Sequence, residues 1–371
     1  MNAAAKKIRV LLVDDSSFMR KVLHGIVSAD PQMEVVGQAK DGNEAIAMAQ
    51  SLKPDVITMD INMPHMDGLQ ATEQIMSQNP RPIVIVSSET RDGASSTLAA
   101  LELGAIDFIS KPSSGIDLDM NSVGIDLNRK LKMAAKVHVI RTAARPKLRA
   151  GAAHRSAPSV VSTEHAGSTA VVGSRFPLVV IAASTGGPAA VMRLAADFPK
   201  DLPAAVVLVQ HMPASFTSQY AIQLADATEI EVKEALANEA LGPGVLYVCP
   251  GSHHLRISPK GRIVLDSGAR ISGYRPCADV AMETAAGWTG PMTTGVVLTG
   301  MGNDGSRGAQ AIYSAGGAVF VQDEATSVIF GMPAEVIKTG FVSQVLPLDQ
   351  IAAAIEKRVR QLASAPQAVL P

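Results

Sequence analysis

Two groups of chemically reactive side chains lie in different halves of this sequence. The first combines carboxylates with a serine and a lysine: Asp14, Asp15, Asp60, Ser87 and Lys111. The second combines a serine, a histidine and an aspartate: Ser184, His211 and Asp304. The first group is typical of a site that holds Mg²⁺ and accepts a phosphoryl group, and the second of a serine hydrolase. Together they predict a hydrolase whose activity is set by phosphorylation of its own front half.

The first group has a consistent chemistry. Clustered carboxylates repel one another unless a hard cation lies among them, and Mg²⁺ prefers carboxylate, water and phosphate oxygens. Asp60 is then the nucleophile that forms an aspartyl phosphate, with Asp14 and Asp15 beside it as metal ligands. Lys111 pairs with a phosphate oxygen, and Ser87 donates a hydrogen bond to it. Any one of these residues alone could be an ordinary polar residue at a strand end.

The second group begins with Ser184, between an expected strand at 178–182 and an expected helix that starts near Pro188. A serine on such a turn is exposed, and backbone N–H groups of the helix N-terminus point toward any oxyanion nearby. Thr185 and Gly186 follow in the same turn, where glycine lets a substrate approach the backbone. This is the logic of a nucleophile elbow, without the G-x-S-x-G spelling.

A nucleophilic serine needs a base and an orienting acid. His211 follows an expected strand at 205–210 and lies at the same sheet edge as Ser184, whereas His253 and His254 are expected to be exposed in a loop. Asp304 follows the strand expected at 294–298. Asp279 and Asp323 are the alternative candidates for the acid that orients the histidine. The glycine-rich loop around Met301 can complete an oxyanion hole with its backbone N–H groups.

Other readings of the second half stay open. The Ser184–Gly187 turn could hold a phosphate at a helix N-terminus, although no Gly-Lys-Ser/Thr follows it. The glycines near Gly300 could belong to a dinucleotide site, but the acidic ribose partner is absent at the usual distance. Cys277 or Cys249 could act as a nucleophile, although a lone cysteine is more often inert.

Alternating apolar runs and helical patterns position both groups. Over residues 8–130 the runs end at five positions: Val13, Ala39, Met59, Val86 and Ile109. This pattern predicts a flavodoxin-like (βα)5 domain with a parallel sheet, in which Ser16 caps the first helix. Because ligands bind at the carboxyl ends of parallel strands, the five residues of the first group converge on one edge.

A linker at residues 131–175 is predicted from its Ala, Ser, Pro and Gly content. It carries an excess of Lys and Arg, which fits a solvated tether or a docking segment for an acidic surface. Residues 176–362 return to the α/β alternation, with strands at 178–182, 205–209, 294–298 and 318–321 and a closing helix at 348–362. We predict a doubly wound parallel sheet there, and a tail at 363–371.

Composition narrows the class of protein. The chain of 371 residues is 47% hydrophobic and 18% charged, which is typical of two globular domains. Its net charge of −1 gives no attraction to nucleic acid, and no apolar run approaches the ~20 residues of a membrane span. Two cysteines build neither a disulfide framework nor a zinc site by themselves. We therefore expect a cytoplasmic protein without membrane insertion.

Residues 8–130 resemble the receiver domain of two-component response regulators. The resemblance covers all five residues of the first group, and also Phe108, where receivers carry an aromatic that changes rotamer on activation. It implies Mg²⁺ as cofactor, a histidine kinase as phosphodonor, and Ser87, Phe108 and Lys111 as the switch residues.

The whole chain resembles the CheB family, chemotaxis response regulators that are protein-glutamate methylesterases. The motifs that match are Ala183–Gly187, Gln210–Pro213 and Met301–Gly305. The resemblance implies a catalytic triad of Ser184, His211 and Asp304, an oxyanion contact from Met301, and a positioning role for Thr185. It also implies hydrolysis of glutamate γ-methyl esters on chemoreceptor cytoplasmic domains, deamidation of receptor glutamines, and no cofactor for the esterase site.

Two positions depart from the family pattern. Ala182 stands where glycine is usual, and Cys277 stands where serine is usual. Neither belongs to the proposed chemistry, so they bear on rate and substrate preference. Two alternative functions stay open: a phosphorylation-gated hydrolase or deamidase of another protein, and a response regulator whose output domain binds without catalysis.

Overall fold

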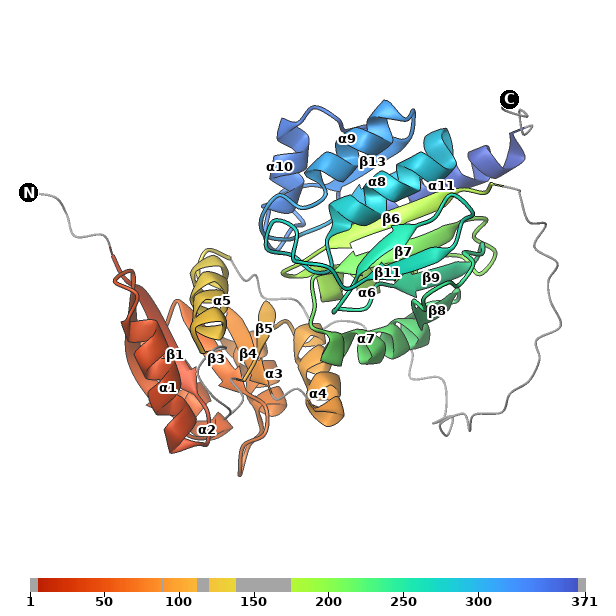
Figure 1. The fold of residues 1–371 in the computed structure, drawn as a ribbon. Coiled ribbons are helices and arrows are strands. Elements are labelled where there is room, and N and C mark those ends of the chain that lie inside the picture. The colour runs from red at the N-terminus through yellow and green to blue at the C-terminus, as the bar shows by residue number, and fades with distance from the viewer. Residues whose placement is uncertain (1–5, 88–89, 112–119, 138–174, 366–371) are drawn as a thin grey trace, which may run out of the picture.

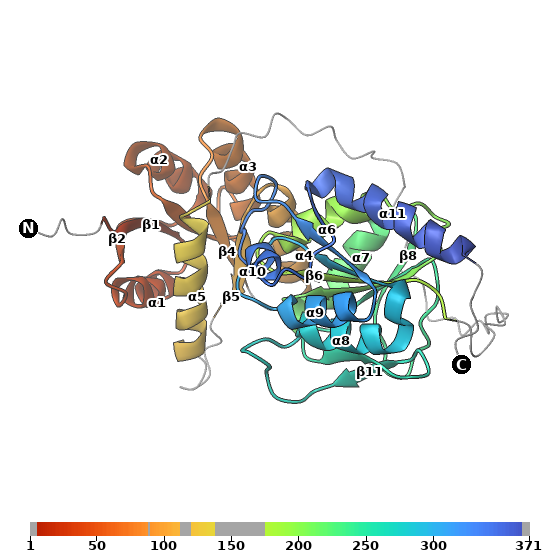
Figure 2. The same cartoon turned by 90° about the horizontal axis from the view of Figure 1, so that it is seen from above.

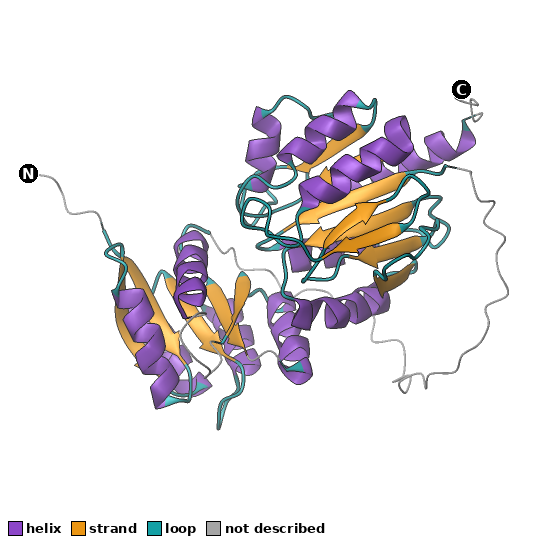
Figure 3. Ribbon diagram, in the orientation of Figure 1, coloured by secondary structure: helices purple, strands orange, loops and turns teal. Residues whose placement is uncertain are grey.

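The computed structural model describes residues 6–87, 90–111, 120–137 and 175–365. They form two α/β units, each a parallel sheet covered by helices on both faces (Figures 1 and 3). Residues 138–174 of the linker predicted at 131–175, and residues 366–371 of the predicted tail, lie outside the described residues. Among the described helices, none is both long enough and apolar enough to cross a membrane.

The first unit has a five-stranded sheet in the order β2-β1-β3-β4-β5. Its strands are β1 (Ile8–Val13), β2 (Met33–Ala39), β3 (Val56–Asp60), β4 (Ile83–Ser87) and β5 (Asp107–Ser110). Its helices are α1 (Ser17–Ser28), α2 (Gly42–Leu52), α3 (Gly68–Gln78), α4 (Arg91–Glu102) and α5 (Met120–Ala134). Helices α1 and α5 contact each other on one face, and α2, α3 and α4 follow one another on the other. The predicted flavodoxin-like fold is confirmed.

Local sequence signals explain these elements. The strands β3 and β4 are buried along their whole length, as continuous apolar runs in a parallel sheet require. Ser16 is the N-cap of α1, since its hydroxyl accepts a hydrogen bond from the N–H of Met19 at 3.3 Å. Helix α5 continues to Ala134, so the boundary predicted at residue 130 falls inside this helix.

The second unit has a seven-stranded parallel sheet in the order β14-β13-β12-β6-β7-β9-β8 and a separate antiparallel hairpin, β10-β11. Its strands are β6 (Leu178–Ala183), β7 (Ala205–Gln210), β8 (Glu231–Glu234), β9 (Val245–Val248), β10 (His254–Ile257), β11 (Ile263–Asp266), β12 (Thr293–Val297), β13 (Ala318–Gln322) and β14 (Gln344–Leu346). Its helices are α6 (Gly187–Ala196), α7 (Ala214–Ala227), α8 (Ala278–Thr289), α9 (Ser306–Ser314), α10 (Met332–Lys338) and α11 (Leu348–Ser364).

The strand order of this sheet predicts a ligand-binding crevice at the carboxyl end of β6. Strand β6 is the first of the unit, and its neighbours β7 and β12 lie on opposite sides of it. Helices α6, α7 and α11 cover one face, and α8, α9 and α10 cover the other, as Figure 2 shows from above. The connections from β6 and β12 therefore leave toward opposite faces. A crevice forms at the carboxyl ends of strands where the direction of connection changes in this way.

The two units share a packed surface. Helix α4 of the first unit lies against α7 and α6 of the second (Figures 1 and 2). One hydrophobic cluster continues through this surface and includes Leu98 and Leu101 of α4 together with Phe216 and Tyr220 of α7. The contact brings the end of β5 to the same place as the crevice beside β6.

Candidate active site

Ser184 lies on the sharp turn between β6 and α6. Its backbone N–H donates to the carbonyl of Thr299 at 3.1 Å, and its carbonyl accepts from the N–H of Gly187 at 2.8 Å. Gly186 has a φ of 75°, and a Cβ there would overlap Val328, so this turn needs glycine. The serine is thereby held, partly exposed, at the carboxyl end of the central strand.

His211 lies directly after β7, beside the serine turn. Its backbone N–H donates to the carbonyl of Ala183 at 3.0 Å, which fixes the two strand ends together. On the side chain, Nε2 lies 2.7 Å from Oδ2 of Asp304, and the buried Nδ1 has no hydrogen-bond partner among the residues that the structure describes. Within the described residues no hydrogen bond joins Ser184 to His211, although both line one cavity. Such contacts commonly tighten only when substrate binds.

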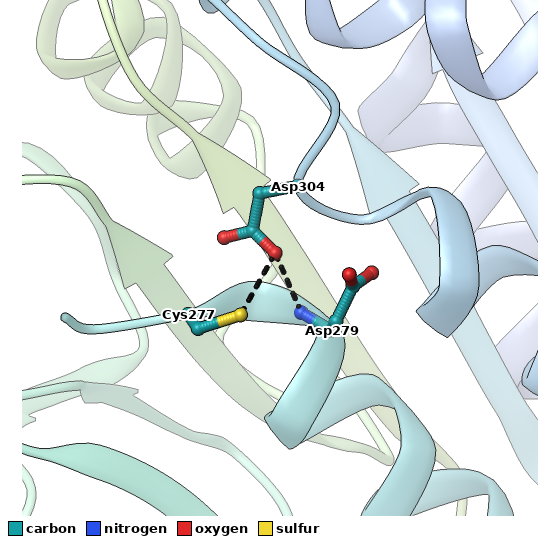
Figure 4. A group of neighbouring side chains, drawn as sticks. All are labelled: Cys277, Asp279 and Asp304. Atoms are coloured by element: carbon teal, nitrogen blue, oxygen red, sulfur yellow. Dashed lines mark hydrogen bonds between the residues drawn. The ribbon is translucent and has the colours of Figure 1, made fainter. Parts of the chain in front are cut away.

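Asp304 is buried and fully engaged at the N-terminus of α8 (Figure 4). Its Oδ2 accepts from the N–H of Ala278 at 2.7 Å in addition to His211, and its Oδ1 accepts from the N–H of Asp279 at 2.9 Å. The thiol of Cys277 donates to Oδ1 at 3.1 Å. Burial alone raises the pKa of Asp304, but His211 and the backbone donors outweigh it, so its pKa lies below the usual range. The carboxylate is therefore ionised wherever His211 acts.

The three side chains in Figure 4 could also be read as a metal site, since their ligand atoms lie within 4.8 Å of one another. The hydrogen bonds argue against that reading. Both oxygens of Asp304 accept backbone donors, while Oδ1 of Asp279 accepts the N–H groups of Gly305 and Gly308, each at 2.9 Å. A cation would have to displace these donors. Asp279, one of the competing acids, thus holds the loop after β12 rather than the histidine.

The loop after β12 passes directly against the serine. A Cβ on Gly300 would overlap Ser184, and Gly302 and Gly305 have φ values of 94° and 93°. The loop therefore depends on glycine for its path, and this path carries Met301 past the serine. Asp323, the other competing acid, instead accepts from the N–H and hydroxyl of Thr326 and lies outside the cavity lining.

The carboxyl edge of the first unit holds the other reactive group. Lys111 Nζ lies 2.9 Å from Asp14 and 2.8 Å from Asp60, and ligand oxygens of Asp14, Asp15 and Asp60 lie within 4.8 Å of one another. Burial raises the pKa of Asp60, and the attraction of Lys111 opposes this only in part. Three carboxylates against one lysine leave an excess of negative charge, which suits a divalent hard cation.

Strand β5 of the first unit contacts the second unit beside Ser184. The hydroxyl of Thr185, next to Ser184, donates a hydrogen bond to Asp107 of the first unit. Phe108 packs its ring against Phe216 of α7, with centroids 4.5 Å apart. Ser87 is buried and donates to the carbonyl of Gly93 at 3.2 Å, so it lies between the acidic cluster and α4. A cavity of about 740 Å³ remains between the units, lined by α5, β5, Ser184 and His211.

Known proteins resemble the chain in both halves. The sequence model described as CheB methylesterase matches residues 179–355, and the one described as response regulator receiver domain matches residues 10–141. A protein-glutamate methylesterase/protein-glutamine glutaminase of Pyrococcus horikoshii is 44% identical over 97% of this chain and 95% of its own length. The proteins of that name from Symbiobacterium thermophilum and Thermotoga maritima are each 42% identical, over 95% and 93% of this chain and 98% and 96% of their own lengths.

This chain belongs to the CheB methylesterase family. It is an enzyme with a receiver domain in front of a methylesterase domain, and the predicted family is confirmed. The doubly wound fold expected for the second half is likewise confirmed by its seven parallel strands.

One expectation about this CheB methylesterase was wrong. His254 was expected to be exposed, but it is buried as the first residue of β10, and its Nε2 lies 3.0 Å from the carbonyl of Ala269. The sequence showed no signal for the short hairpin β10-β11, and the Pro-Gly pair before it indicated a loop. His253, its neighbour, is half-buried and bonded to Ser252. Neither histidine lines the cavity.

Sequence reasoning about the methylesterase missed two residues of the site, Asp107 and Tyr274, and considered Asp279 only as a competing acid and not as the residue that holds the loop after β12. Asp107 lies next to Phe108, but its contact with Thr185 depends on how the domains dock. Tyr274 stacks on His211 with ring centroids 4.3 Å apart and planes inclined by 15°. The Arg-Pro-Cys-Ala-Asp stretch that follows Tyr274 could have indicated that this segment belongs to the site, since it supplies most of the hydrogen-bond donors to Asp304.

Proposed function

We propose that this protein is a phosphorylation-activated methylesterase of chemoreceptors. It hydrolyses glutamate γ-methyl esters on receptor cytoplasmic domains to glutamate and methanol, and it deamidates receptor glutamines. The observation that carries the proposal is the pair of His211 and Asp304, 2.7 Å apart, beside the Ser184 turn at the switch point of the sheet. The names of the related proteins support both activities.

In the proposed mechanism Ser184 Oγ attacks the ester carbonyl while His211 takes its proton. The buried Nδ1 of His211 has no partner among the described residues, which supports it as the atom that would receive the proton. Asp304, held ionised on Nε2, stabilises the imidazolium that forms. Methanol leaves with that proton, and a water, deprotonated in turn by His211, cleaves the acyl-serine to glutamate. With a glutamine substrate the leaving group is ammonia.

The developing oxyanion needs donors near Ser184. The loop of Gly300 and Met301 passes against the serine, so the Met301 N–H and the N-terminal N–H groups of α6 around Gly186 are the candidates. Each oxyanion donor contributes about 100- to 1000-fold to the rate in serine hydrolases. This esterase chemistry uses no cofactor in our proposal.

Asp60 is the proposed phosphoacceptor, with a histidine kinase as the source of the phosphoryl group. Asp14, Asp15 and Asp60 would hold Mg²⁺, which supplies charge neutralisation for the incoming phosphoryl group. Lys111, already within 3 Å of Asp14 and Asp60, is placed to pair with the phosphate. Ser87 is the switch residue whose hydroxyl moves from the carbonyl of Gly93 to the phosphate.

We propose that the receiver domain covers the esterase site in the unphosphorylated protein, and that phosphorylation weakens this packing. The receiver domain contacts Thr185 through Asp107 and α7 through α4 and Phe108, beside the cavity of Ser184. A change at Ser87 and Phe108 would weaken this packing and open the crevice to a receptor helix. We place the reaction in the cytoplasm, where receptor signalling domains and a kinase are both accessible.

The test is methanol release from methylated chemoreceptor membranes, with and without acetyl phosphate and Mg²⁺. We expect release that increases with phosphodonor and disappears in Ser184→Ala. Asp60→Asn should retain the basal rate and lose the stimulation. Stimulation that persists in Asp60→Asn would contradict the coupling, and release that persists in Ser184→Ala would contradict the assignment of the nucleophile. Release from no receptor preparation under any condition would mean that the substrate is a different protein.

A further inference from the structure

Tyr274 covers one face of the His211 ring. The two rings are nearly parallel, with an angle of 15° and centroids 4.3 Å apart. Tyr274 is half-buried and lines the cavity that also contains Ser184 and His211. It therefore contacts the residue that we assign as the base.

The segment that carries Tyr274 is a tight turn. Ile271 and Tyr274 exchange backbone hydrogen bonds, each of 2.9 Å, and the two residues between them, Ser272 and Gly273, have φ values of 52° and 87°. Two consecutive positive φ angles are typical of the turns that close a β-hairpin. The guanidinium of Arg275 also donates to the carbonyls of Ser267 and Gly268 at 3.0 and 2.9 Å. The backbone of Tyr274 is thus fixed by its own loop.

The tyrosine hydroxyl reaches the opposite wall of the site. It donates to the carbonyl of Met301 at 3.3 Å. The next residue, Gly302, has a φ of 94°, and a Cβ on it would overlap the Tyr274 hydroxyl. The loop is therefore shaped to accept this side chain. One tyrosine spans from the histidine to the loop proposed to bind the oxyanion.

We propose that Tyr274 is a positioning residue for His211, an inference that rests on the proposed function. Its ring restricts rotation of the imidazole, so that Nε2 stays on Asp304 and the unpartnered Nδ1 stays available to Ser184. The face of an aromatic ring also attracts a cation, which favours the imidazolium formed when the serine proton is transferred. The ring thus acts on the histidine during the step, and the hydroxyl aligns the Met301 loop.

Tyr274 does not serve as an acid or base in this proposal. Burial raises its pKa above the ordinary value; Arg129 opposes this effect and the charge of Asp304 adds to it. The hydroxyl therefore stays protonated and acts as a donor to Met301. A role in packing alone would lower the stability of the fold without changing the reactivity of Ser184, and this difference separates the two readings.

The experiment measures how fast Ser184 is modified by phenylmethanesulfonyl fluoride in the full chain. In this reaction Ser184 Oγ bonds to sulfur, fluoride leaves, and the serine proton passes to His211, so the rate reports the base without any receptor. Mass spectrometry of the peptide containing Ser184 gives the rate. Tyr274→Leu removes the ring face, and Tyr274→Phe retains it without the hydroxyl. Tyr313→Leu, on α9 and 44% exposed, is the matched control for the loss of an aromatic ring elsewhere.

We expect Tyr274→Leu to be labelled about tenfold more slowly, a factor that corresponds to ~1.4 kcal/mol in the barrier. Tyr274→Phe keeps the ring but loses the hydrogen bond to the Met301 loop, so it should be labelled faster than Tyr274→Leu and more slowly than the unaltered chain. Tyr313→Leu should be labelled at close to the rate of the unaltered chain. In methanol release, Tyr274→Leu should lower kcat with little change in KM. If leucine unfolds the domain, Tyr274→Met gives the same test with a side chain that fits irregular gaps.

The outcomes separate this inference from the proposed function. Equal labelling of the unaltered chain and the folded Tyr274→Leu or Tyr274→Met variant would overturn the inference and leave the triad intact. Absence of labelling at Ser184 in the unaltered chain would overturn the proposed function and the inference with it.

Discussion

The hydroxyl of Thr185 donates a hydrogen bond to the carboxylate of Asp107, which lies 78 residues earlier in the chain and in the other domain. Thr185 is the neighbour of Ser184, and Asp107 is the neighbour of Phe108, so the bond joins the turn after β6 to β5 of the receiver domain. Lys130 of α5 holds the second oxygen of Asp107 at 3.0 Å. A displacement of β5 would therefore act directly on the residue beside Ser184, the proposed nucleophile.

Asp107→Ala should raise the activity of the unphosphorylated protein. The substitution removes an interdomain hydrogen bond to a charged group, and such bonds contribute ~1.5–3 kcal/mol. Because water compensates in part, we expect methanol release without phosphodonor to rise by about five- to tenfold. Asp30→Ala is the matched control, since Asp30 pairs with another lysine of α5, Lys132, away from the interface. An unchanged basal rate in Asp107→Ala would show that this bond does not hold the domains together.

Phosphorylation should control access of a receptor helix much more than access of a small ester. The cavity beside Ser184 measures about 740 Å³ with the receiver in place, which is in the range for a drug-sized ligand. A helix with its side chains is ~10–12 Å wide and needs the domains to separate. We expect acetyl phosphate with Mg²⁺ to stimulate receptor demethylation by at least tenfold.

Hydrolysis of p-nitrophenyl acetate should change by less than twofold under the same conditions, after subtraction of the Ser184→Ala background. Equal stimulation of both substrates would show instead that phosphorylation changes the catalytic residues themselves.

The sequence predicted the elements whose burial gives a pattern. Strands such as β3 and β6 are buried on both faces and appear as short apolar runs between turn signals. The edge strands β8 and β14 gave no such signal, because β8 reads Glu-Val-Lys-Glu and β14 has only three residues, mostly exposed. Hydrogen bonds to inner neighbours, rather than their own side chains, make these segments strands.

The residues of the site also differ in whether the sequence could predict their positions. The shared position of Ser184, His211 and Asp304 was predictable because each follows a strand of one sheet, and the sheet alone brings such positions together. The contacts of Tyr274 and Asp107 were not predictable. Tyr274 depends on a hairpin turn with two positive φ angles, and Asp107 depends on the docking of two domains. Neither arrangement leaves a periodic pattern in the sequence.

Asp60→Asn should stabilise the receiver in the absence of Mg²⁺. Burial raises the pKa of Asp60 above its unfolded value, so its ionised form costs stability at every pH above the folded pKa. That cost disappears as the pH falls below the unfolded value of ~3.9. At neutral pH and without Mg²⁺ we therefore expect a higher Tm for Asp60→Asn than for the unaltered protein, measured by calorimetry.

Magnesium provides the complementary measurement. Mg²⁺ binding to the folded acidic cluster should raise the Tm of the unaltered protein, and EDTA should reverse the rise. The variant Asp60→Asn should respond much less, since it lacks one of the three carboxylates. Calorimetry at several Mg²⁺ concentrations checks both statements, and an equal response of the variant would place the ion elsewhere.

Cys277 should act as a replaceable hydrogen-bond donor to Asp304. Its thiol lies 3.1 Å from Oδ1, and burial followed by the charge of Asp304 raises its pKa to about 12, so it remains a neutral donor. A hydroxyl is a stronger donor than a thiol. Cys277→Ser should therefore keep or slightly increase kcat. Cys277→Ala should lower kcat by about three- to tenfold, because Asp304 loses one donor while backbone N–H groups retain the carboxylate.

The matched control for Cys277 is Cys249→Ala, which removes the other buried thiol from a position bonded to the carbonyls of Pro250 and His253. It should leave kcat unchanged, since the partners of Cys249 do not include Ser184, His211 or Asp304, the residues of the proposed triad. We therefore expect the rate of methanol release to be highest in Cys277→Ser, close to the unaltered rate in Cys249→Ala, and lowest in Cys277→Ala. If Cys277→Ser and Cys277→Ala lose activity to the same extent, the thiol contributes by its volume in the packing against α8, and its hydrogen bond to Asp304 is not the reason for its effect.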